Sequence, residues 1–277
     1  MKPNTETGPI RIWHQSITDL NTLPMYREAT EALVAKYTSS DTTVDIHGVA
    51  PGTYPGRVAP IDALQYKWIQ QLVNTQMVSA AIKAEEQGYD VMALTCYFDP
   101  GLFEARSVVD IPVVGIFESS LLVATTIGQS FGLVVINPFQ ARFMKELVKS
   151  YGLEQRIAAI VSIDPPLNEL EIDGNIDAEA LRDRVVVAAK KTIQEGADVI
   201  IPAENVLNAL LMNSGEEILA GAPVINGMAS LFAHAEMMVK LSRRTGLRTS
   251  RAGALARPDQ AIARHIQSIA GAQLLKS

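Results

Sequence analysis

Two residues of this chain have reactive side chains and hold matching places in its two halves. Cys96 is the only cysteine in the sequence and lies just beyond the apolar run 91–94. Glu204 lies just beyond a similar run at 199–202. Open α/β sheets place ligands and chemistry at the carboxyl ends of such buried strands. Cys96 and Glu204 are therefore the first candidates for catalysis.

An internal repeat connects these two positions. In each copy a helical segment ends at a glycine, and an aspartate and an apolar strand follow. The offset is 108 residues both for Gly88 and Gly196 (196 − 88) and for Cys96 and Glu204 (204 − 96). The repeat predicts two similar α/β halves that face each other, with Cys96 and Glu204 on opposite sides of one cleft.

A thiolate and a carboxylate that face each other can act on a ligand in two ways. As two bases on opposite faces of an acidic carbon, one removes a proton and the other returns it, which inverts the centre. Alternatively, Cys96 attacks an electrophilic carbon while Glu204 moves a proton or activates water. Backbone N–H groups from Tyr97 onward can stabilise the thiolate or a developing oxyanion. An apolar strand end is expected to raise the pKa of Glu204.

Simpler roles remain open for both residues. A single cysteine is often a buried small apolar residue, and Glu204 can serve as a helix cap or as one half of an ion pair. The repeat favours catalysis because it predicts that the two side chains converge. Histidines 14, 47, 234 and 265 have no metal-ligand spacing, and phosphate-binding loops are absent. We therefore expect no metal site.

The bulk composition narrows the class of protein. The chain has 277 residues, of which 48% are hydrophobic and 19% charged, and this composition argues against disorder. Its formal net charge of −6 argues against nucleic acid as a partner. No membrane span is expected, because Gln129 and Ser130 interrupt the most apolar stretch. A single cysteine is typical of a reducing compartment, so we expect a cytoplasmic protein. We also expect a homo-oligomer that acts on a small molecule.

Strands that alternate with helices predict an α/β fold with right-handed crossovers. We expect two pseudo-symmetric three-layer α/β/α domains with mainly parallel four-stranded sheets and the active site between them. The first domain would comprise residues 10–125 with 226–277, and the second residues 126–225. Strands are expected near 10–14, 43–48, 111–116, 131–136, 158–163 and 222–227, and helices near 25–37 and 66–87.

Further candidates for substrate binding lie at the predicted strand ends and in a loop rich in proline and glycine. Ser119 and Ser120 would open a helix and bind a carboxylate there. Arg57, in the loop, would pair with a substrate carboxylate. The full set is His14, Gln15, Ser16, Tyr54, Arg57, Thr95, Tyr97, Phe98, Ser119, Ser120, Asn137 and Asn205.

Several motifs resemble the Asp/Glu/hydantoin racemase superfamily, in particular its hydantoin-racemase branch. They are CYFDPGL at 96–102, IPVVGIFE at 111–118, GAPVING at 221–227 and GLRTSR at 246–251, and the resemblance spans nearly the whole chain. It implies two pseudo-symmetric domains, no cofactor, and substrates such as hydantoins, amino acids or small dicarboxylates. Gln15-Ser16 departs from the Asn-Pro-Asn that is usual in the family at the first strand end.

The more important departure is Glu204, because racemases of this family usually carry a second cysteine there. Two unequal groups fit a one-directional reaction better than balanced racemisation. Our main hypothesis is therefore hydrolytic replacement at C2 of a hydantoin-like ring, such as desulfuration of a thiohydantoin with release of hydrogen sulfide. The alternative is a hydantoin or amino-acid racemase that uses Cys96 and Glu204 as its two bases. A third possibility is a two-lobed binding protein for small carboxylates.

Overall fold

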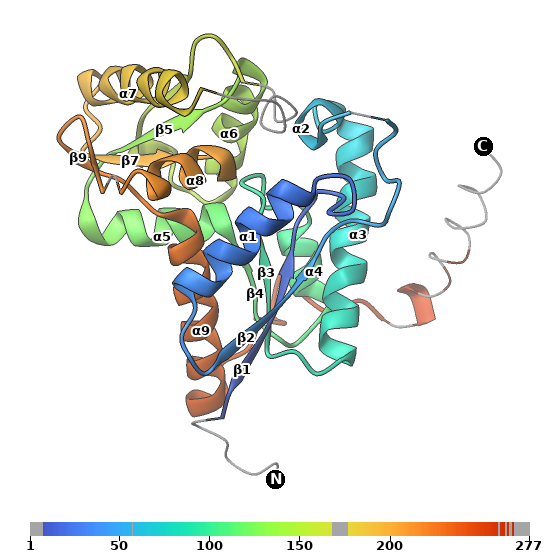
Figure 1. The fold of residues 1–277 in the computed structure, drawn as a ribbon. Coiled ribbons are helices and arrows are strands. Elements are labelled where there is room, and N and C mark those ends of the chain that lie inside the picture. Colours follow the sequence, from blue (N-terminus) through green and yellow to red (C-terminus); the bar gives the residue numbers. More distant parts are fainter. Residues whose placement is uncertain are drawn as a thin grey trace.

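The computed structural model describes residues 8–56, 58–167, 177–215, 217–259, 261–263, 265 and 268. Over this part the chain forms two parallel sheets, each flanked by helices (Figure 1). The predicted α/β class is confirmed. None of the described helices is both long enough and apolar enough to cross a lipid bilayer.

The first half contains a four-stranded parallel sheet in the order β2-β1-β3-β4. Helices α3 and α4 pack on one side of it, and α9 packs on the other with α1 beside it (Figure 1). The elements are β1 (Ile10–Gln15), α1 (Pro24–Tyr37), β2 (Thr42–His47), α2 (Pro60–Ala63), α3 (Lys67–Glu86), β3 (Val91–Leu94), α4 (Leu102–Val108), β4 (Val113–Gly115), α5 (Ile116–Ile127) and α9 (Gly227–Thr245).

The second half contains a three-stranded parallel sheet in the order β6-β5-β7. Right-handed crossovers place α6 and α7 on opposite faces of this sheet. Its elements are β5 (Phe131–Val135), α6 (Pro138–Ser150), η1 (Glu154–Arg156), β6 (Ile157–Ser162), α7 (Ala178–Gln194), β7 (Val199–Pro202), α8 (Asn205–Asn213), β8 (Ile218–Leu219) and β9 (Ala222–Pro223).

The second sheet differs in one respect from the four strands predicted for each half. The segment expected as its fourth strand, 222–227, pairs with β7 only through an isolated bridge between Ile200 and Val224. Its first residues instead form β9, which pairs antiparallel with β8. Pro223 has no N–H to donate to a ladder, and the preceding Ala220 has a positive φ of 52°, so the chain turns instead of continuing alongside β7.

The internal repeat is visible in the backbone. β3 and β7 begin and end 108 residues apart (199 − 91 and 202 − 94). Each follows a long helix that ends at a glycine with positive φ, +75° at Gly88 and +98° at Gly196. Glycine adopts this left-handed conformation without a steric penalty. The two strands are buried along their whole length, although β3 lies inside its sheet and β7 is the last strand of its own.

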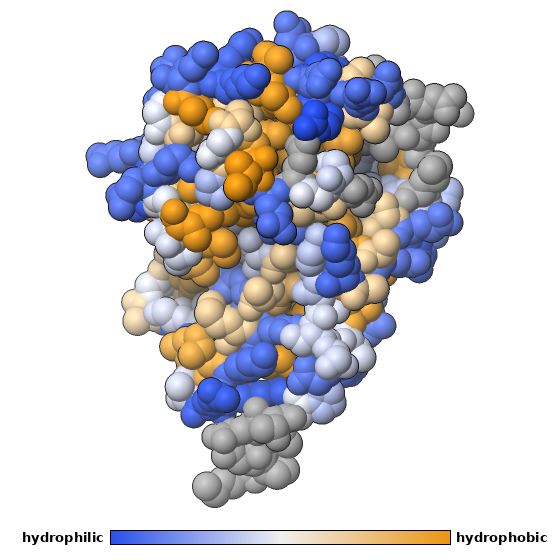
Figure 2. Space-filling view, turned by 60° about the vertical axis from the view of Figure 1, so that its left-hand side comes forward, coloured by the Kyte–Doolittle hydropathy of each residue, from blue (hydrophilic) through white to orange (hydrophobic). Residues whose placement is uncertain are grey.

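The division into domains stays a proposal, and the packing of the last helix supports it. After leaving the second half, the chain returns in α9, which packs on β1, β3 and β4 and runs beside α5. The space-filling view brings the side with α5 and α7 forward and shows apolar patches among polar residues (Figure 2). We propose residues 10–125 with 226–277 as one domain and 126–225 as the other.

Candidate active site

Cys96 and Glu204 follow β3 and β7, and a hydrogen bond between their neighbours joins the two strand ends. Asn205, just after the glutamate, donates from its side-chain amide to the backbone carbonyl of Thr95, just before the cysteine. Neighbouring Cα atoms lie about 3.8 Å apart, so this bond also keeps Cys96 near Glu204. The structure thus brings together the two strand ends that carry the residues paired by the repeat.

A second link between the halves lies one residue beyond the cysteine. The buried hydroxyl of Tyr97 accepts a hydrogen bond from Nδ2 of Asn208 at 2.7 Å, and Oδ1 of Asn208 accepts one from the backbone N–H of Gly227 at 2.9 Å. A Cβ atom at Gly227 would overlap the Tyr97 hydroxyl, so this position requires glycine. Burial raises the pKa of Tyr97, which stays neutral and serves as an anchor.

The turn that carries Cys96 is held by a buried carboxyl group. The N–H of Asp99 donates to the carbonyl of Cys96 at 2.8 Å. The Asp99 carboxyl accepts hydrogen bonds from the N–H groups of Phe117 and Glu118, at 3.2 and 2.9 Å, and from the Tyr151 hydroxyl at 2.6 Å. It therefore caps the start of α5 from outside the helix. Burial raises the pKa of Asp99 to about 7.

Glu204 is held from two sides. One carboxyl oxygen accepts from the N–H of Asn205 at 2.9 Å, so Glu204 caps α8, and the other accepts from Nε2 of Gln140 at 3.2 Å. Gln140 also donates to the carbonyl of Ala203 at 2.8 Å. Burial raises the pKa of Glu204 to about 7. A carboxyl group with this pKa can both hold and release a proton near neutral pH. Glu204 also has the simpler role that its sequence position allows, that of a helix cap.

The polar residues predicted after β4 and β5 have local partners. The hydroxyl of Ser119 donates to the carbonyl of Gly115 at 2.6 Å, and that of Ser120 donates to the carbonyl of Ile116 at 2.7 Å. Since α5 already begins at Ile116, both serines lie beyond the first N–H groups of the helix. Asn137 is the N-cap of α6. A substrate role for these side chains would require them to exchange these bonds.

The end of β1 sends its side chains to opposite faces of the sheet. Gln15 accepts from Nε1 of Trp13 at 2.9 Å and lies with it on the α3 side. Ser16 is buried and accepts from the N–H of Thr18 at 3.1 Å. His14 faces the other way and lines a small cavity that also includes Thr95 and Asn205.

The remaining predicted site residues have different surroundings. Phe98 packs against Phe143 of α6, with ring centroids 4.1 Å apart and the rings tilted by 31°, and so connects the cysteine turn to the second half. Tyr54 is half-buried against the core. Arg57 lies outside the described residues.

Sequence reasoning did not identify Gln140 and Asn208, which position the segment around Glu204. Gln140 is fully buried, and Asn208 is 1% exposed. Each is a polar residue on a buried helix face that is otherwise apolar. Buried amides nearly always have hydrogen-bond partners. An amide side chain on a buried helix face is therefore a sequence signal for a positioning residue, although it does not identify the partner.

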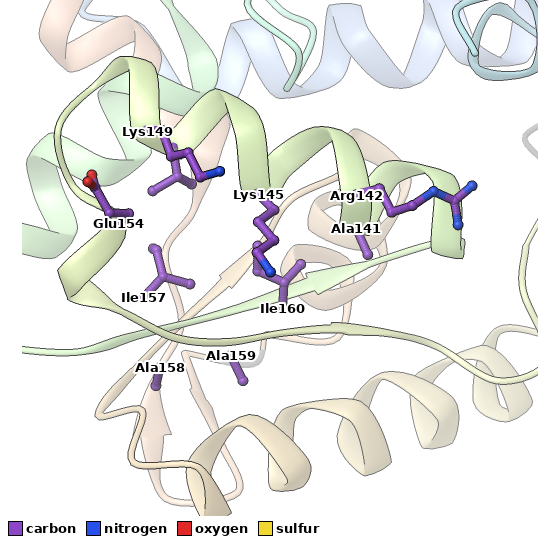
Figure 3. Close-up of a pocket in the computed structure, with 10 residues that line it drawn as sticks. Ala141, Arg142, Lys145, Lys149, Glu154, Ile157, Ala158, Ala159 and Ile160 are labelled. Atoms are coloured by element: carbon purple, nitrogen blue, oxygen red, sulfur yellow. The ribbon is translucent and has the colours of Figure 1, made fainter.

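A larger cavity than the one beside His14 lies away from these residues. It measures about 440 Å³ and lies between α6 and the edge strand β6 (Figure 3). Arg142, Lys145 and Lys149 line it from α6, and Glu154 lies at one end. It contains neither Cys96 nor Glu204, so size alone does not locate the chemistry. Within the described ranges no three His, Cys, Asp or Glu side chains are grouped to hold a metal ion.

Comparison with known proteins agrees with the resemblance in the sequence. The family model described as Asp/Glu/hydantoin racemase matches residues 22–235. The hydantoin racemase of Pseudomonas sp. (strain NS671) is 34% identical over 163 residues, which cover 59% of this chain and 64% of that protein. The hydantoin racemase of Rhizobium meliloti is 31% identical over 163 residues, covering 59% and 66%. The match thus spans just under two thirds of either relative.

A solved structure extends this likeness to the fold. The allantoin racemase from Klebsiella pneumoniae superposes with a TM-score of 0.70 and 24% identity, over 91% of this chain and 94% of that one. At this identity the likeness shows a common fold. It covers both sheets, and with the family match it confirms the resemblance drawn from the four sequence motifs.

Proposed function

The chain belongs to the Asp/Glu/hydantoin racemase family, and on that premise we propose that it moves a proton at an acidic carbon of a small hydantoin-like ring or a related carboxylate. Cys96 and Glu204 would be the two bases, and no cofactor would take part. The observation that carries this proposal is the hydrogen bond from Asn205 to Thr95, which holds the two strand ends together.

The reaction needs one proton acceptor and one proton donor on opposite faces of the ring. The Cys96 thiolate removes the proton from C5, and the ring carbonyl takes up the negative charge. The Glu204 carboxyl, with its pKa raised to about 7, then gives a proton to the other face. The reverse direction exchanges the two roles. A cysteine thiol ordinarily titrates near pH ~8.5, so the thiolate fraction rises through the neutral range.

The names of the relatives favour this reaction over the hydrolytic one. The two curated relatives described above are hydantoin racemases, whose names state inversion of a centre and no chemistry at C2. Racemisation was the alternative in the sequence-based reasoning, and it is better supported than desulfuration.

One observation keeps the hydrolytic reaction as a second candidate. Position 204 carries a buried carboxyl in place of a second thiol, and the two groups differ in basicity and nucleophilicity. In that reaction the Cys96 sulfur attacks C2 of a 2-thiohydantoin, and the ring sulfur leaves as hydrogen sulfide. Glu204 activates water, which releases the thiol and leaves a C2 carbonyl. The net change consumes one water and no oxidant.

Incubation in D₂O with enantiopure 5-substituted hydantoins and 2-thiohydantoins distinguishes the two candidates. We expect deuterium at C5 together with loss of optical rotation, and no sulfide. Sulfide release with an intact C5 proton would support the second candidate and exclude the first. If neither substrate class reacts, and Cys96→Ala matches the wild type in both assays, both candidates are wrong.

A homo-oligomer and a cytoplasmic location are also part of the proposal. Four large apolar side chains are exposed on the packed helices α5 and α9, and burial in a subunit contact would remove them from water. They are Leu122, Ile127, Met237 and Leu241. Sedimentation velocity tests this part, since a single monomeric species at micromolar concentration would contradict it.

A further inference from the structure

A cavity of about 200 Å³ lies directly beside the candidate catalytic pair. It is enclosed by α1, α8 and the start of α9, at the ends of β1 and β3. Its lining includes Thr95, which precedes Cys96, and Asn205, which follows Glu204. The cavity wall is thus one residue along the chain from each member of the pair. The rest of its wall is mostly apolar, with Leu33 and Val206 among the residues that form it.

Two polar side chains in the wall have atoms without partners. His14 is 1% exposed, yet neither of its ring nitrogens has a hydrogen-bond partner. Oδ1 of Asn205 is also buried without a partner. The orientation of this amide is fixed, because the carbonyl of Thr95 can only accept and so faces Nδ2. More than 90% of buried polar groups are satisfied in folded proteins, so three such atoms around one cavity indicate that a ligand completes them.

The unpartnered atoms define the chemistry of that ligand. Burial lowers the pKa of His14 to about 4, so the imidazole is neutral at pH 7 and offers one donor and one acceptor. Asn205 Oδ1 adds a second acceptor. A primary amide, with two N–H donors and one carbonyl acceptor, complements this set. A carboxylate has no donor and would face the Asn205 oxygen, and no Lys or Arg is among the residues that line this cavity.

We propose that this cavity binds the substituent at C5 of the substrate ring, that this substituent is a short chain ending in an uncharged amide, and that His14 and Asn205 select it. The inference rests on the proposed function, because it assumes a ring held at Cys96. One water in the liquid occupies about 30 Å³, so about 200 Å³ accommodates a carbamoylethyl chain.

Three hydantoins of similar size test the selection. They carry 2-carbamoylethyl, 2-carboxyethyl or isobutyl at C5, so the end group is an amide, a carboxylate or a pair of methyls. Calorimetric titration of Cys96→Ser measures binding without turnover. We expect the amide to bind about tenfold or more tightly than either analogue. Equal affinities, or tightest binding of the carboxylate, would overturn the proposal.

Two sets of variants test where the substituent binds. His14→Leu removes both nitrogens at similar volume, and it should reverse the preference from the amide to isobutyl. Ala29→Phe adds a ring at an exposed part of the cavity wall and should reduce the preference for any substituted ring over unsubstituted hydantoin. Ala32→Phe is the matched control, since Ala32 is exposed on the same helix and does not line the cavity. Unchanged selectivity in both His14→Leu and Ala29→Phe, with native circular dichroism, would refute the location.

These measurements separate the inference from the function on which it rests. Deuterium exchange at C5 of unsubstituted hydantoin reports the proton transfer alone, because that ring carries no substituent. Exchange that depends on Cys96, combined with no selectivity for the amide, would reject the cavity and retain the proposed reaction. Selective binding without any exchange would reject the reaction and retain the cavity as the binding place.

Discussion

The two strand ends at the candidate site have the same backbone arrangement but hold different reactive groups in different ways. Asp90 and Asp198, each one residue before its strand, accept hydrogen bonds from backbone N–H groups at the start of a neighbouring strand. Beyond the strands the halves diverge. Cys96 lies on a turn, and a separate residue, Asp99, caps α5. Glu204 is itself the cap of its helix.

This difference shows how the two sides divide placement and chemistry. On the cysteine side, two other residues, Asp99 and Tyr97, fix the turn that carries the half-buried thiol. On the glutamate side one carboxyl group caps α8, and the proposed reaction would require the same group to exchange protons. Its supports, Gln140 and the N–H of Asn205, therefore bear directly on its proton affinity. Substitutions should thus affect activity and stability separately on the first side and together on the second.

The largest expected effect is on activity, from Cys96→Ala and Glu204→Gln. Each should lower racemisation by about a thousandfold or more, because inversion requires both bases. Each variant retains one base and should still exchange the C5 proton of one enantiomer, with the opposite enantiomer retained in the other variant. Proton NMR in D₂O with each pure enantiomer measures this. The same enantiomer preference in both variants would contradict the placement of the two groups on opposite faces.

Cys96→Ala and Glu204→Gln should also differ in their free energy of unfolding. Cys96→Ala removes a half-buried thiol, while Glu204→Gln replaces a buried carboxyl that caps α8.

Gln140→Met should have the next largest effect and tests the support of Glu204. It removes the donor to the carboxyl while keeping a long unbranched side chain. Activity should fall about tenfold to a hundredfold. The hydrogen bond from Gln140 lowers the pKa of Glu204, so without it the pKa rises further above its usual range. The limb of the pH–rate profile that belongs to Glu204 should move to higher pH.

A merely structural role for Gln140 would reduce the rate without moving that limb. Gln155→Met is the matched control, because Gln155 is exposed in the same half of the molecule. It should leave both the rate and the profile unchanged.

Asp99→Asn tests the cysteine side through the pH dependence of stability. The folded pKa of Asp99 is about 7, above its ordinary value of 3.8. A raised carboxyl pKa gives a contribution to stability that is complete below pH 4 and is lost as the pH rises through 7. Asparagine tolerates the positive φ of 42° at this position and does not titrate.

The wild type should therefore lose about 4 kcal/mol more than Asp99→Asn between pH 4 and 7.5, because each unit of pKa shift corresponds to about 1.4 kcal/mol. Urea unfolding at both pH values measures this difference. If the unfolding free energies of the two proteins changed equally with pH, Asp99 would not be responsible for the pH dependence of stability.

The repeat and the positions of the strands could be predicted from the sequence because they depend on local features. Gly88 and Gly196 end helices by adopting positive φ, and the apolar runs that follow them are too uniform for surface strands. These features were enough to pair Cys96 with Glu204.

The supports of the site could not be predicted because their partners are distant in sequence. Gln140 lies 64 residues from Glu204, and Tyr151 lies 52 residues from Asp99. The start of α5 illustrates the same limit. Ser119 and Ser120 have the composition of a helix start, but Asp99, which is remote in sequence, caps the helix and allows it to begin at Ile116.

The smallest expected effects come from the part of the repeat that the two halves share. Asp198 accepts from the N–H groups of Gln129 and Ser130, both at 2.8–3.1 Å, and these bonds lower its pKa. Asp198→Ala leaves those groups to water and should cost about 1 kcal/mol at pH 7. Because the pKa is lowered, this contribution is present above pH 3.8 and lost in acid, the opposite slope to Asp99.

Asp90→Ala should cost somewhat more, since Asp90 also pairs with Arg243 at 3.0 Å. Urea midpoints at pH 7 and 3 test this order, and a larger loss for Asp198→Ala would show that the two halves do not use their shared aspartate alike.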